Sequence, residues 1–209
     1  MVEGQTHTPA EFLNRFLRSR RSVRRFLPIE LDPGVLARII ETASHAPSAH
    51  NRQPWRFAVL THPESKTILA ESMAAGFRQD LTADGLSEAE IETLVNRSRK
   101  RVAQAPVVVV LCMDMSEMDT YPDEKRRQAE RVMAIQSTAL AGLQLQLAAQ
   151  AEGLGTVWVC APLFAPQAVR AALGLPEAWE PQGMLFIGFP DGEPKPKQMK
   201  PPAEVVRYM

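Results

Sequence analysis

The residues with the clearest capacity for chemistry are four arginines packed into one short turn. The turn contains Arg20, Arg21, Ser22, Val23, Arg24 and Arg25. Guanidinium groups form paired, charge-assisted hydrogen bonds with phosphate oxygens, which a single lysine cannot supply. We therefore treat the turn as a candidate phosphate site. Two alternatives stay open: a solvated basic turn, because charge runs are usually exposed, and a nucleic-acid contact, for which the interleaved aromatic residues that stack on bases are missing.

A loop of small and polar residues is the second candidate. It contains Pro47, Ser48, Ala49, His50, Asn51, Arg52 and Gln53. Small side chains let a planar ring approach the backbone, while hydroxyl and amide groups offer hydrogen bonds. An ordinary structured loop is the alternative. His45 and His50 have no cysteine or carboxylate at ligand spacing in the sequence, so we predict no metal site.

Two further segments could complete a binding site. A loop, Cys160, Ala161, Pro162 and Leu163, follows a predicted strand over residues 156–160. Ligands commonly lie at the carboxyl ends of strands. The tail spaces Lys195, Lys197 and Lys200 between prolines. It is either a solvated end or a segment that closes over an anion held by the arginine turn.

The elements that must position these residues follow from hydrophobic periodicity and helix caps. Helices are expected over residues 11–18, 33–43, 64–75, 123–152 and 166–173, with another after the Ser87 and Glu90 capping box. Strands are expected over 55–61, 106–113, 156–160, 183–189 and 204–208. The apolar run 106–113 is typical of a strand buried on both faces. The predicted class is α+β, with a central mixed or antiparallel sheet flanked by helices.

Composition limits the function classes. The 209 residues suit one domain over 1–209, and 24 basic residues balance 24 acidic ones, which argues against a nucleic-acid or membrane partner. The N-terminus lacks the apolar core of a signal peptide, and no apolar run approaches a membrane span, so a cytoplasmic protein is expected. Cys112 and Cys160 lie in apolar runs, where a thiol behaves as a small hydrophobe.

In this order along the chain, the four segments resemble the nitroreductase superfamily over nearly the whole length. The resemblance implies an FMN cofactor. It also implies that Arg20, Arg21, Ser22, Val23 and Arg24 hold the phosphate and ribityl chain. In the same way, Pro47, Ser48, Ala49 and Asn51 would line the flavin from the other subunit, and Cys160, Ala161, Pro162 and Leu163 would lie against its ring. A tail lysine, Lys197 or Lys200, would return to the phosphate.

Within the superfamily, the resemblance is closer to the FMN-binding C-terminal domain of the bifunctional ligase that makes the deazaflavin coenzyme factor 420. Residues 78–85, 121–123 and 179–181 carry this similarity. It implies hydride transfer from NAD(P)H or another reduced donor, through FMN, to an organic acceptor such as a dehydro precursor of that coenzyme. The alternatives are a general NAD(P)H-dependent nitro or quinone reductase and a non-catalytic flavin-binding protein. No side chain is assigned as catalytic.

The family further implies an intertwined homodimer. We expect the long helix to supply the subunit contact, because Ala139 and Gly142 would let another helix approach, and the strand at 204–208 to cross to the partner. Residues 77–101 are interpreted as a lid over the flavin. Its Arg78, Arg97 and Arg101 would hold a small anionic heterocycle, although a solvated helix face explains the same charges.

Overall fold

The computed structural model describes residues 8–194 and 197–209. Its centre is a four-stranded sheet in the order β1-β2-β4-β3, in which every neighbouring pair is antiparallel. The strands are β1 (Trp55–Leu60), β2 (Val107–Asp114), β3 (Gly155–Val159) and β4 (Trp179–Gly188). Every residue of β2 is buried, as its unbroken apolar run predicts. The α+β class and the antiparallel sheet are thereby confirmed.

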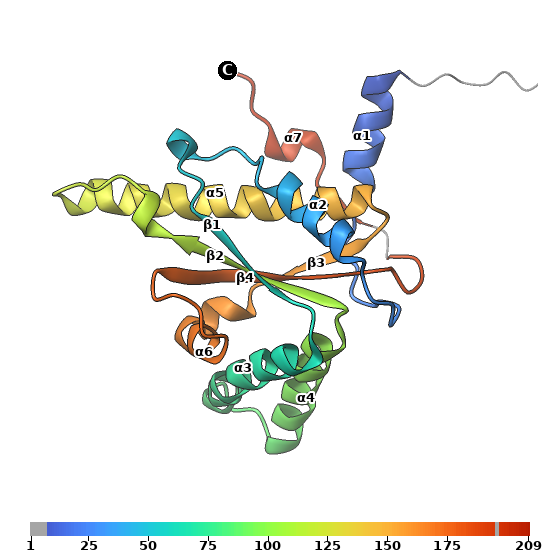
Figure 1. The fold of residues 1–209 in the computed structure, drawn as a ribbon, viewed down its shortest axis with the longest axis vertical. Helices are drawn as coiled ribbons and strands as arrows, with labels where there is room; N and C mark the ends of the chain where they lie inside the picture. Colours follow the sequence, from blue (N-terminus) through green and yellow to red (C-terminus); the bar gives the residue numbers. More distant parts are fainter. Residues whose placement is uncertain (1–7, 195–196) are drawn as a thin grey trace, which may run out of the picture.

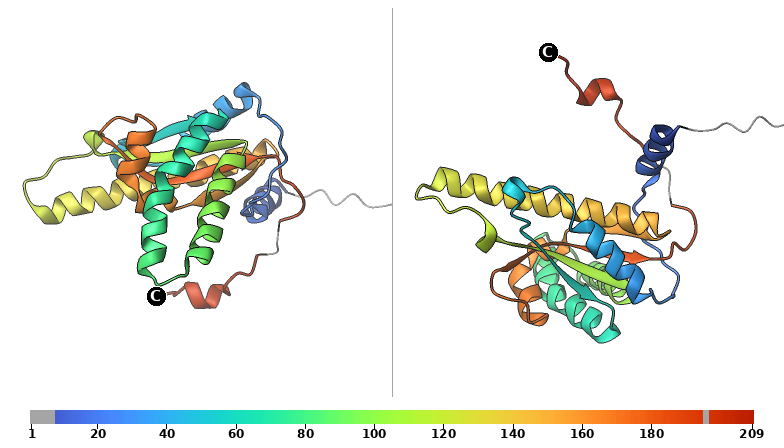
Figure 2. Two further views of the ribbon diagram at one scale, coloured as in Figure 1. Left: turned by 90° about the horizontal axis from the view of Figure 1, so that it is seen from below. Right: turned by 45° about the horizontal axis from the view of Figure 1, so that its top comes forward.

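Helices cover both faces of the sheet. One face carries α2 (Pro33–Ala43) and α5 (Glu124–Ala151), and the other carries α3 (Pro63–Ala83), α4 (Glu88–Gln104) and α6 (Pro166–Ala172), as Figures 1 and 2 show. Each interface has its own core. Leu36, Ile39 and Leu145 are buried between the sheet and the first pair, whereas Leu69 and Val169 are buried on the opposite face.

Several helix starts follow their caps closely. The Asp32 carboxylate accepts a hydrogen bond from the Gly34 N–H at 2.6 Å, with Pro33 in the first turn. Ser87 and Glu90 form the expected capping box at the start of α4, and Asp123 caps α5 by accepting from the Arg126 N–H at 3.0 Å. These polar caps satisfy N–H groups that have no partner within the helix.

Helix α3 runs further than the predicted 64–75. The expected end at residue 75 is wrong, because α3 continues through Gly76 to Ala83. A glycine inside a helix costs only about 1 kcal/mol, which the packing of α3 against α4 and the sheet overcomes. The turn that follows contains Gly85, with a φ of 80°.

The tail differs from the prediction. The expected strand at 204–208 is wrong, because α7 (Pro202–Val205) occupies its first part. Pro202 stands at the first helical position, where its fixed φ favours a helix. The Val206 N–H then donates to the Pro202 carbonyl at 2.9 Å. In Figures 1 and 2, α7 and α1 (Pro9–Ser19) both stand away from the sheet.

The small residues of α5 also have another role than expected. Gly142 faces the sheet of its own chain, and a Cβ there would clash with the Trp158 ring and lie 2.8 Å from Leu111 Cδ2. The expected helix contact at Gly142 is therefore wrong. Ala139 points to solvent.

Helix α5 contradicts the expectation that no apolar run approaches the length of a membrane span. By length and composition it could cross a membrane, alone among the helices of the described residues. In this fold one face of α5 packs against α2 and the sheet, which accounts for the buried part of its apolar content.

Candidate functional site

The arginine turn is attached to the edge of the sheet through its backbone. The Val23 N–H donates to the Thr156 carbonyl at 2.9 Å, and Ser22 forms a parallel bridge with Thr156 of β3. The close packing of Val23 requires a glycine at position 155, because a Cβ there would lie 2.7 Å from the Val23 side chain. On the other side, the Asp191 N–H donates to the Arg25 carbonyl at 3.0 Å. The turn is thus fixed from both flanks.

Three guanidinium groups of the turn contact neutral partners only. Among the described residues, Arg20 donates to Gln146 Oε1 at 3.4 Å, Arg21 donates to the last carbonyls of α1, including that of Arg18 at 2.8 Å, and Arg24 donates to the Ser22 carbonyl at 3.5 Å. Arg25 differs, because it pairs with Asp191 at 2.7 Å. The positive charge of the first three is therefore available to an anion.

A hollow of about 520 Å³ lies over the turn. It is bordered by all four arginines, Ser22, Val23, residues 191–194 and Lys197, so that five basic side chains face two acidic ones. Lys197 is thus the tail lysine that borders the hollow, whereas Lys200 is not among the bordering residues. Lys195 lies outside the described part of the chain. Such a basic hollow fits a phosphate.

The polar loop forms a short 3₁₀ helix, η1 (Ala49–Asn51), beside α5. The Ala49 N–H donates to Ser137 Oγ at 3.2 Å, and the Gln53 N–H donates to Ser48 Oγ at 3.0 Å. His50, Asn51 and Gln53 have φ values of 50°, 54° and 49°. Non-glycine residues rarely adopt this left-handed conformation, which clusters at functional sites. Pro47 and Asn51 are exposed.

The segment after β3 also forms a short 3₁₀ helix, η3 (Ala161–Phe164). Cys160 and Leu163 are exposed, Ala161 is half-buried and Pro162 is buried. The expectation of a shielded thiol is therefore wrong for Cys160, because β3 ends one residue before it. The other thiol, Cys112, is fully buried, and burial raises its pKa to about 12.

The arginine turn and η1 contact α5 at separate points. The arginine turn contacts α5 at Gln146, whereas η1 contacts it at Ser137. Nine helical residues separate these contacts, which is about 14 Å along the axis. By contrast, the turn and η3 share β3: Thr156 binds the turn and Cys160 follows the other end, about 13 Å away along an extended strand.

A cavity of about 410 Å³ opens beside η3, between α3 and α4. Its wall is mainly apolar and includes Met73, Phe77, Phe164 and Ala161. Sequence reasoning did not predict it, because its lining comes from three separate elements.

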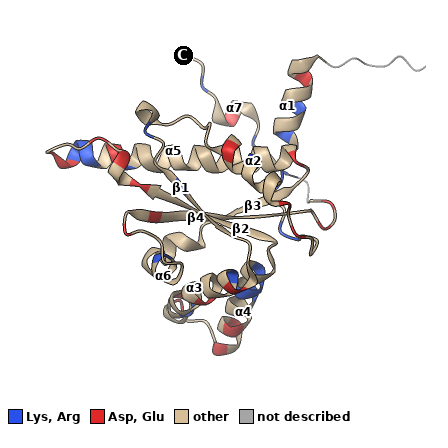
Figure 3. Cartoon of the chain, in the orientation of Figure 1, with Lys and Arg blue, Asp and Glu red and all other residues tan. Residues whose placement is uncertain are grey.

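The predicted lid charges are partly neutralised. Arg78 pairs with Glu88 at 2.6 Å and Glu92 at 2.5 Å, and these contacts raise its pKa, the Glu92 hydrogen bond most of all. Arg97 and Arg101 are exposed. Figure 3 shows basic and acidic residues side by side on α3 and α4, so this surface is not a uniformly positive one.

Comparison with known proteins places this arrangement in a family. Residues 17–189 match the nitroreductase family. An NADH dehydrogenase of Thermus thermophilus is 30% identical over 213 residues, covering 90% of this chain and 92% of that protein. A 5,6-dimethylbenzimidazole synthase of Rhodospirillum rubrum is 31% identical over 189 residues, covering 87% and 83%. The chain belongs to the nitroreductase family and is an oxidoreductase of that family.

Solved structures share the fold. A BluB-like flavoprotein from Clostridium difficile superimposes with a TM-score of 0.74 at 23% identity, covering 94% of this chain and 98% of that one. A nitroreductase from Desulfovibrio desulfuricans, solved in complex with FMN, gives a TM-score of 0.72 at 23% identity and covers 98% of both chains. None of these four relatives is named for the deazaflavin coenzyme.

Proposed function

We propose that this chain is an FMN-dependent oxidoreductase that takes electrons from NAD(P)H, and that its site is completed only in a homodimer. One observation supports the cofactor above all others. An arginine turn without acidic partners on three of its guanidiniums is hydrogen-bonded to the start of β3, and the exposed segment from Cys160 to Leu163 follows the end of the same strand. Bound FMN would supply the redox chemistry.

In this proposal the chain's own residues bind and orient the cofactor. Arg20, Arg21 and Arg24 hold the phosphate through charge-assisted hydrogen bonds, and Lys197 adds a further charge. The small residues of η3 present backbone and an exposed Leu163 side chain to a flat ring. Ser48 and Asn51 of the polar loop, which contacts α5 at Ser137 and not at Gln146, serve the site of the partner subunit.

Exposed apolar surface supports the homodimer. Helix α1 buries none of its residues, and Phe12, Leu13 and Leu17 are each more than half exposed. The outer face of α5 exposes Ile135, Leu140 and Leu143, and the tail exposes further large side chains: Val205, Val206 and Tyr208. Large exposed apolar patches mark protein interfaces. A second copy of the chain would cover them and would bring η1 to the arginine turn of the first.

The acceptor is proposed in two versions. The broader one, a nitro or quinone reductase activity with NAD(P)H as donor, agrees with a relative named NAD(P)H nitroreductase, from Bacillus subtilis, at 26% identity. The narrower one, an anionic deazaflavin precursor, relies on the exposed Arg97 and Arg101. Because Arg78 is already paired with two glutamates, the apolar cavity beside η3 favours the broader version. We expect one FMN-binding domain in a cytoplasmic protein.

The first experiment is the absorption spectrum of the purified protein, since bound flavin is yellow. Reduction by NADH and NADPH is followed as bleaching, and turnover is then assayed with a nitroarene, a quinone and a deazaflavin precursor. Formation of 5,6-dimethylbenzimidazole is assayed as well, given the relative of that name. A protein that refuses FMN, or that binds it without any turnover, contradicts the proposed enzyme.

Thiol labelling tests the position of the ring independently of activity. Cys160 is exposed and Cys112 is buried, so a thiol reagent should modify one cysteine in the native chain and both after unfolding. Saturating FMN should slow the modification of Cys160 at least several-fold. An unchanged rate would remove η3 from the flavin site while leaving the arginine turn untested.

A further inference from the structure

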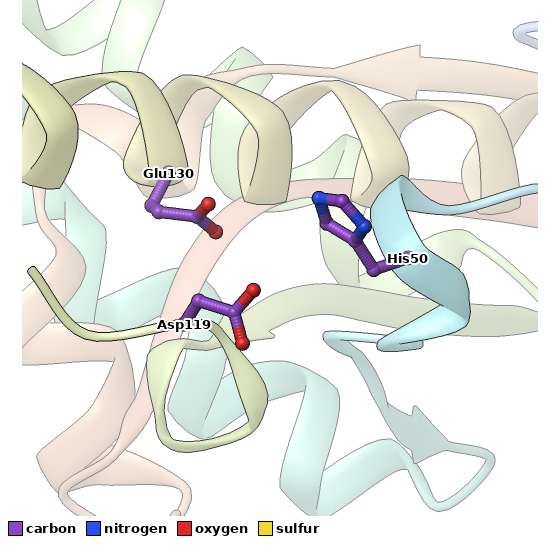
Figure 4. Close-up of side chains that lie close together, drawn as sticks. All are labelled: His50, Asp119 and Glu130. Atoms are coloured by element: carbon purple, nitrogen blue, oxygen red, sulfur yellow. The ribbon is translucent and has the colours of Figure 1, made fainter.

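Three side chains from distant parts of the sequence converge beside η1. They are His50 of η1, Asp119 in the loop before α5, and Glu130 of α5, and Figure 4 shows that all three point toward one common space. One ligand atom of each lies within 4.8 Å of those of the other two. The sequence gives no sign of this group, because its members are far apart along the chain. His50 has no carboxylate at ligand spacing along the chain, but the fold brings two carboxylates close to it.

Glu130 is the unusual member of the group. Its side chain is only 2% exposed, and its Oε2 atom has no hydrogen-bond partner in the described structure. Beside it lies a small apolar cluster that includes Met113, Met118 and Ala134. An unpaired carboxylate in such surroundings is costly, and a positive charge beside it would offset that cost.

The distances between the ligand atoms of the three side chains favour a shared cation over direct contacts between these side chains. No hydrogen bond or ion pair joins any two of the three side chains, all of which lie within the described residues. Ligand atoms that each sit about 2.0–2.2 Å from one ion are at most about 4.4 Å apart. A contraction of a few tenths of an ångström would therefore bring the three atoms around one ion.

Two neighbouring features bear on the site. His50 has a φ of 50°, and this strained backbone directs its imidazole toward the carboxylates. Asp119 uses Oδ1 to pair with Arg52, which leaves Oδ2 for a ligand. The guanidinium weakens the attraction for a cation but also holds Asp119 in place. The imidazole is exposed, so an ion can enter from solvent and keep water at its open positions.

We propose that His50, Asp119 and Glu130 form a binding site for one first-row divalent transition-metal ion, of which Zn²⁺ is the representative. An imidazole with two carboxylates suits such an ion, whereas Mg²⁺ and Ca²⁺ prefer oxygen ligands throughout. The ion would join η1 to α5 and neutralise Glu130. Because Asn51 follows His50, it would also order the segment that faces the partner's flavin, a consequence that rests on the proposed function.

The test measures zinc binding to the full-length, chelator-treated protein by titration calorimetry, with Co²⁺ absorption as a second probe of ligand geometry. We expect one ion per chain and at least tenfold weaker binding for Glu130→Gln. The matched control is Glu124→Gln on the same helix, an exposed glutamate that pairs with Arg127 and should bind zinc like the parent. Equal affinity in Glu130→Gln and the parent, or no binding to the parent, overturns the proposal.

A second pair of variants guards against misfolding. Asparagine tolerates the left-handed conformation, so His50→Asn should fold and still lose zinc at least tenfold, whereas His45→Asn, at another exposed histidine, should not. Zinc should raise the Tm of the parent and of both control variants, but not of Glu130→Gln or His50→Asn. Titrations with and without FMN separate the two proposals, because zinc binding persists in a chain that refuses flavin.

Discussion

Helix α5 holds two segments by different means, one at Ser137 in its middle and one at Gln146 nearer its C-terminus. Near Gln146, the arginine turn is fixed by a backbone hydrogen bond to β3 and by close packing of Val23 on Gly155, and within the described residues the guanidiniums of Arg20, Arg21 and Arg24 have no acidic partner. Near Ser137, η1 is fixed by a side chain of α5 and by three residues with positive φ. The arginine turn presents positive side chains on a backbone of ordinary conformation. The η1 segment has a backbone of unusual conformation and few charged side chains.

This difference teaches how each segment should respond to change. A site built on charge weakens with salt and with the loss of one side chain. A site built on backbone conformation tolerates salt but depends on which residues can adopt that conformation. Because α5 connects both segments, a disturbance at its centre should affect them together.

The largest effect is therefore expected for Gly142→Leu, midway between the two contacts. The new side chain would clash with Trp158 and Leu111, and overpacking of this kind costs about 3 kcal/mol or more. Denaturant unfolding should show this loss, accompanied by weaker flavin binding. Ala139→Leu, at an exposed position on the same helix, should remain close to the parent. Parental stability in Gly142→Leu would contradict the packing described for α5.

Next in size is Arg24→Ala, which acts on the charged end alone. Losing one charge-assisted partner of the phosphate costs about 1.5–3 kcal/mol, so FMN affinity should fall about tenfold or more, with little change in unfolding free energy. Arg25→Ala is the matched control, because Arg25 already pairs with Asp191. Fluorescence titration with FMN at low and high salt measures both. Equal losses of FMN affinity in Arg24→Ala and Arg25→Ala would mean that the turn is a solvated loop and not a phosphate site.

A smaller effect is expected at the strained end. Gln53 has a φ of 49°, a conformation that glycine adopts without penalty, so Gln53→Gly should leave the protein as stable as the parent or more stable by up to about 1 kcal/mol. Ser44→Gly, at a φ of −71°, should instead lose about 0.5–1 kcal/mol. Thermal unfolding compares the two. Equal destabilisation would mean that η1 is not strained.

The smallest effect concerns pH at the η1 half of α5. A hydrogen bond from the Arg131 guanidinium holds the pKa of Glu180 below its ordinary value of 4.5. The stabilisation is therefore present above that value and is lost as pH falls through the lowered pKa. Because both side chains are partly exposed, it amounts to less than about 1 kcal/mol.

Urea unfolding at pH 7 and pH 3.5 tests this pair. The parent should lose slightly more stability than Glu180→Gln over this interval, while the exposed control Glu177→Gln should follow the parent. An identical acid response in the parent and Glu180→Gln would assign the pair no role in stability.

Features that depend on short sequence patterns could be predicted from the sequence. The buried strand β2 follows from its apolar run, the starts of α2, α4 and α5 from their caps, and the basic turn from its composition. The order of the four segments was sufficient to indicate the family. These signals lie within a few residues of one another, so no knowledge of the tertiary structure is needed.

Features that depend on tertiary contacts could not be predicted. Gly142 looked like a helix contact because the sequence does not reveal that Trp158 packs on it. The carboxylates near His50 come from two other elements, and no glycine marks the positive φ values at His50, Asn51 and Gln53. The expected strand at 204–208 is wrong although its β-branched residues favour a strand. Pro202 favours a helix start, and no strand of the described residues pairs with this segment.

Helix α1 has a consequence for the order of folding events. It has eleven residues, buries none of them in the described protomer, and is attached to the body mainly where Gln150 donates to the Phe16 carbonyl at 2.8 Å. A helix this short is marginal by itself in water. The sheet and its helices can therefore form in a first-order reaction, whereas in the proposed homodimer α1 would become stable only in a bimolecular step, with a rate that depends on protein concentration. On dilution, its amide hydrogens should exchange first, while those of β2 remain protected.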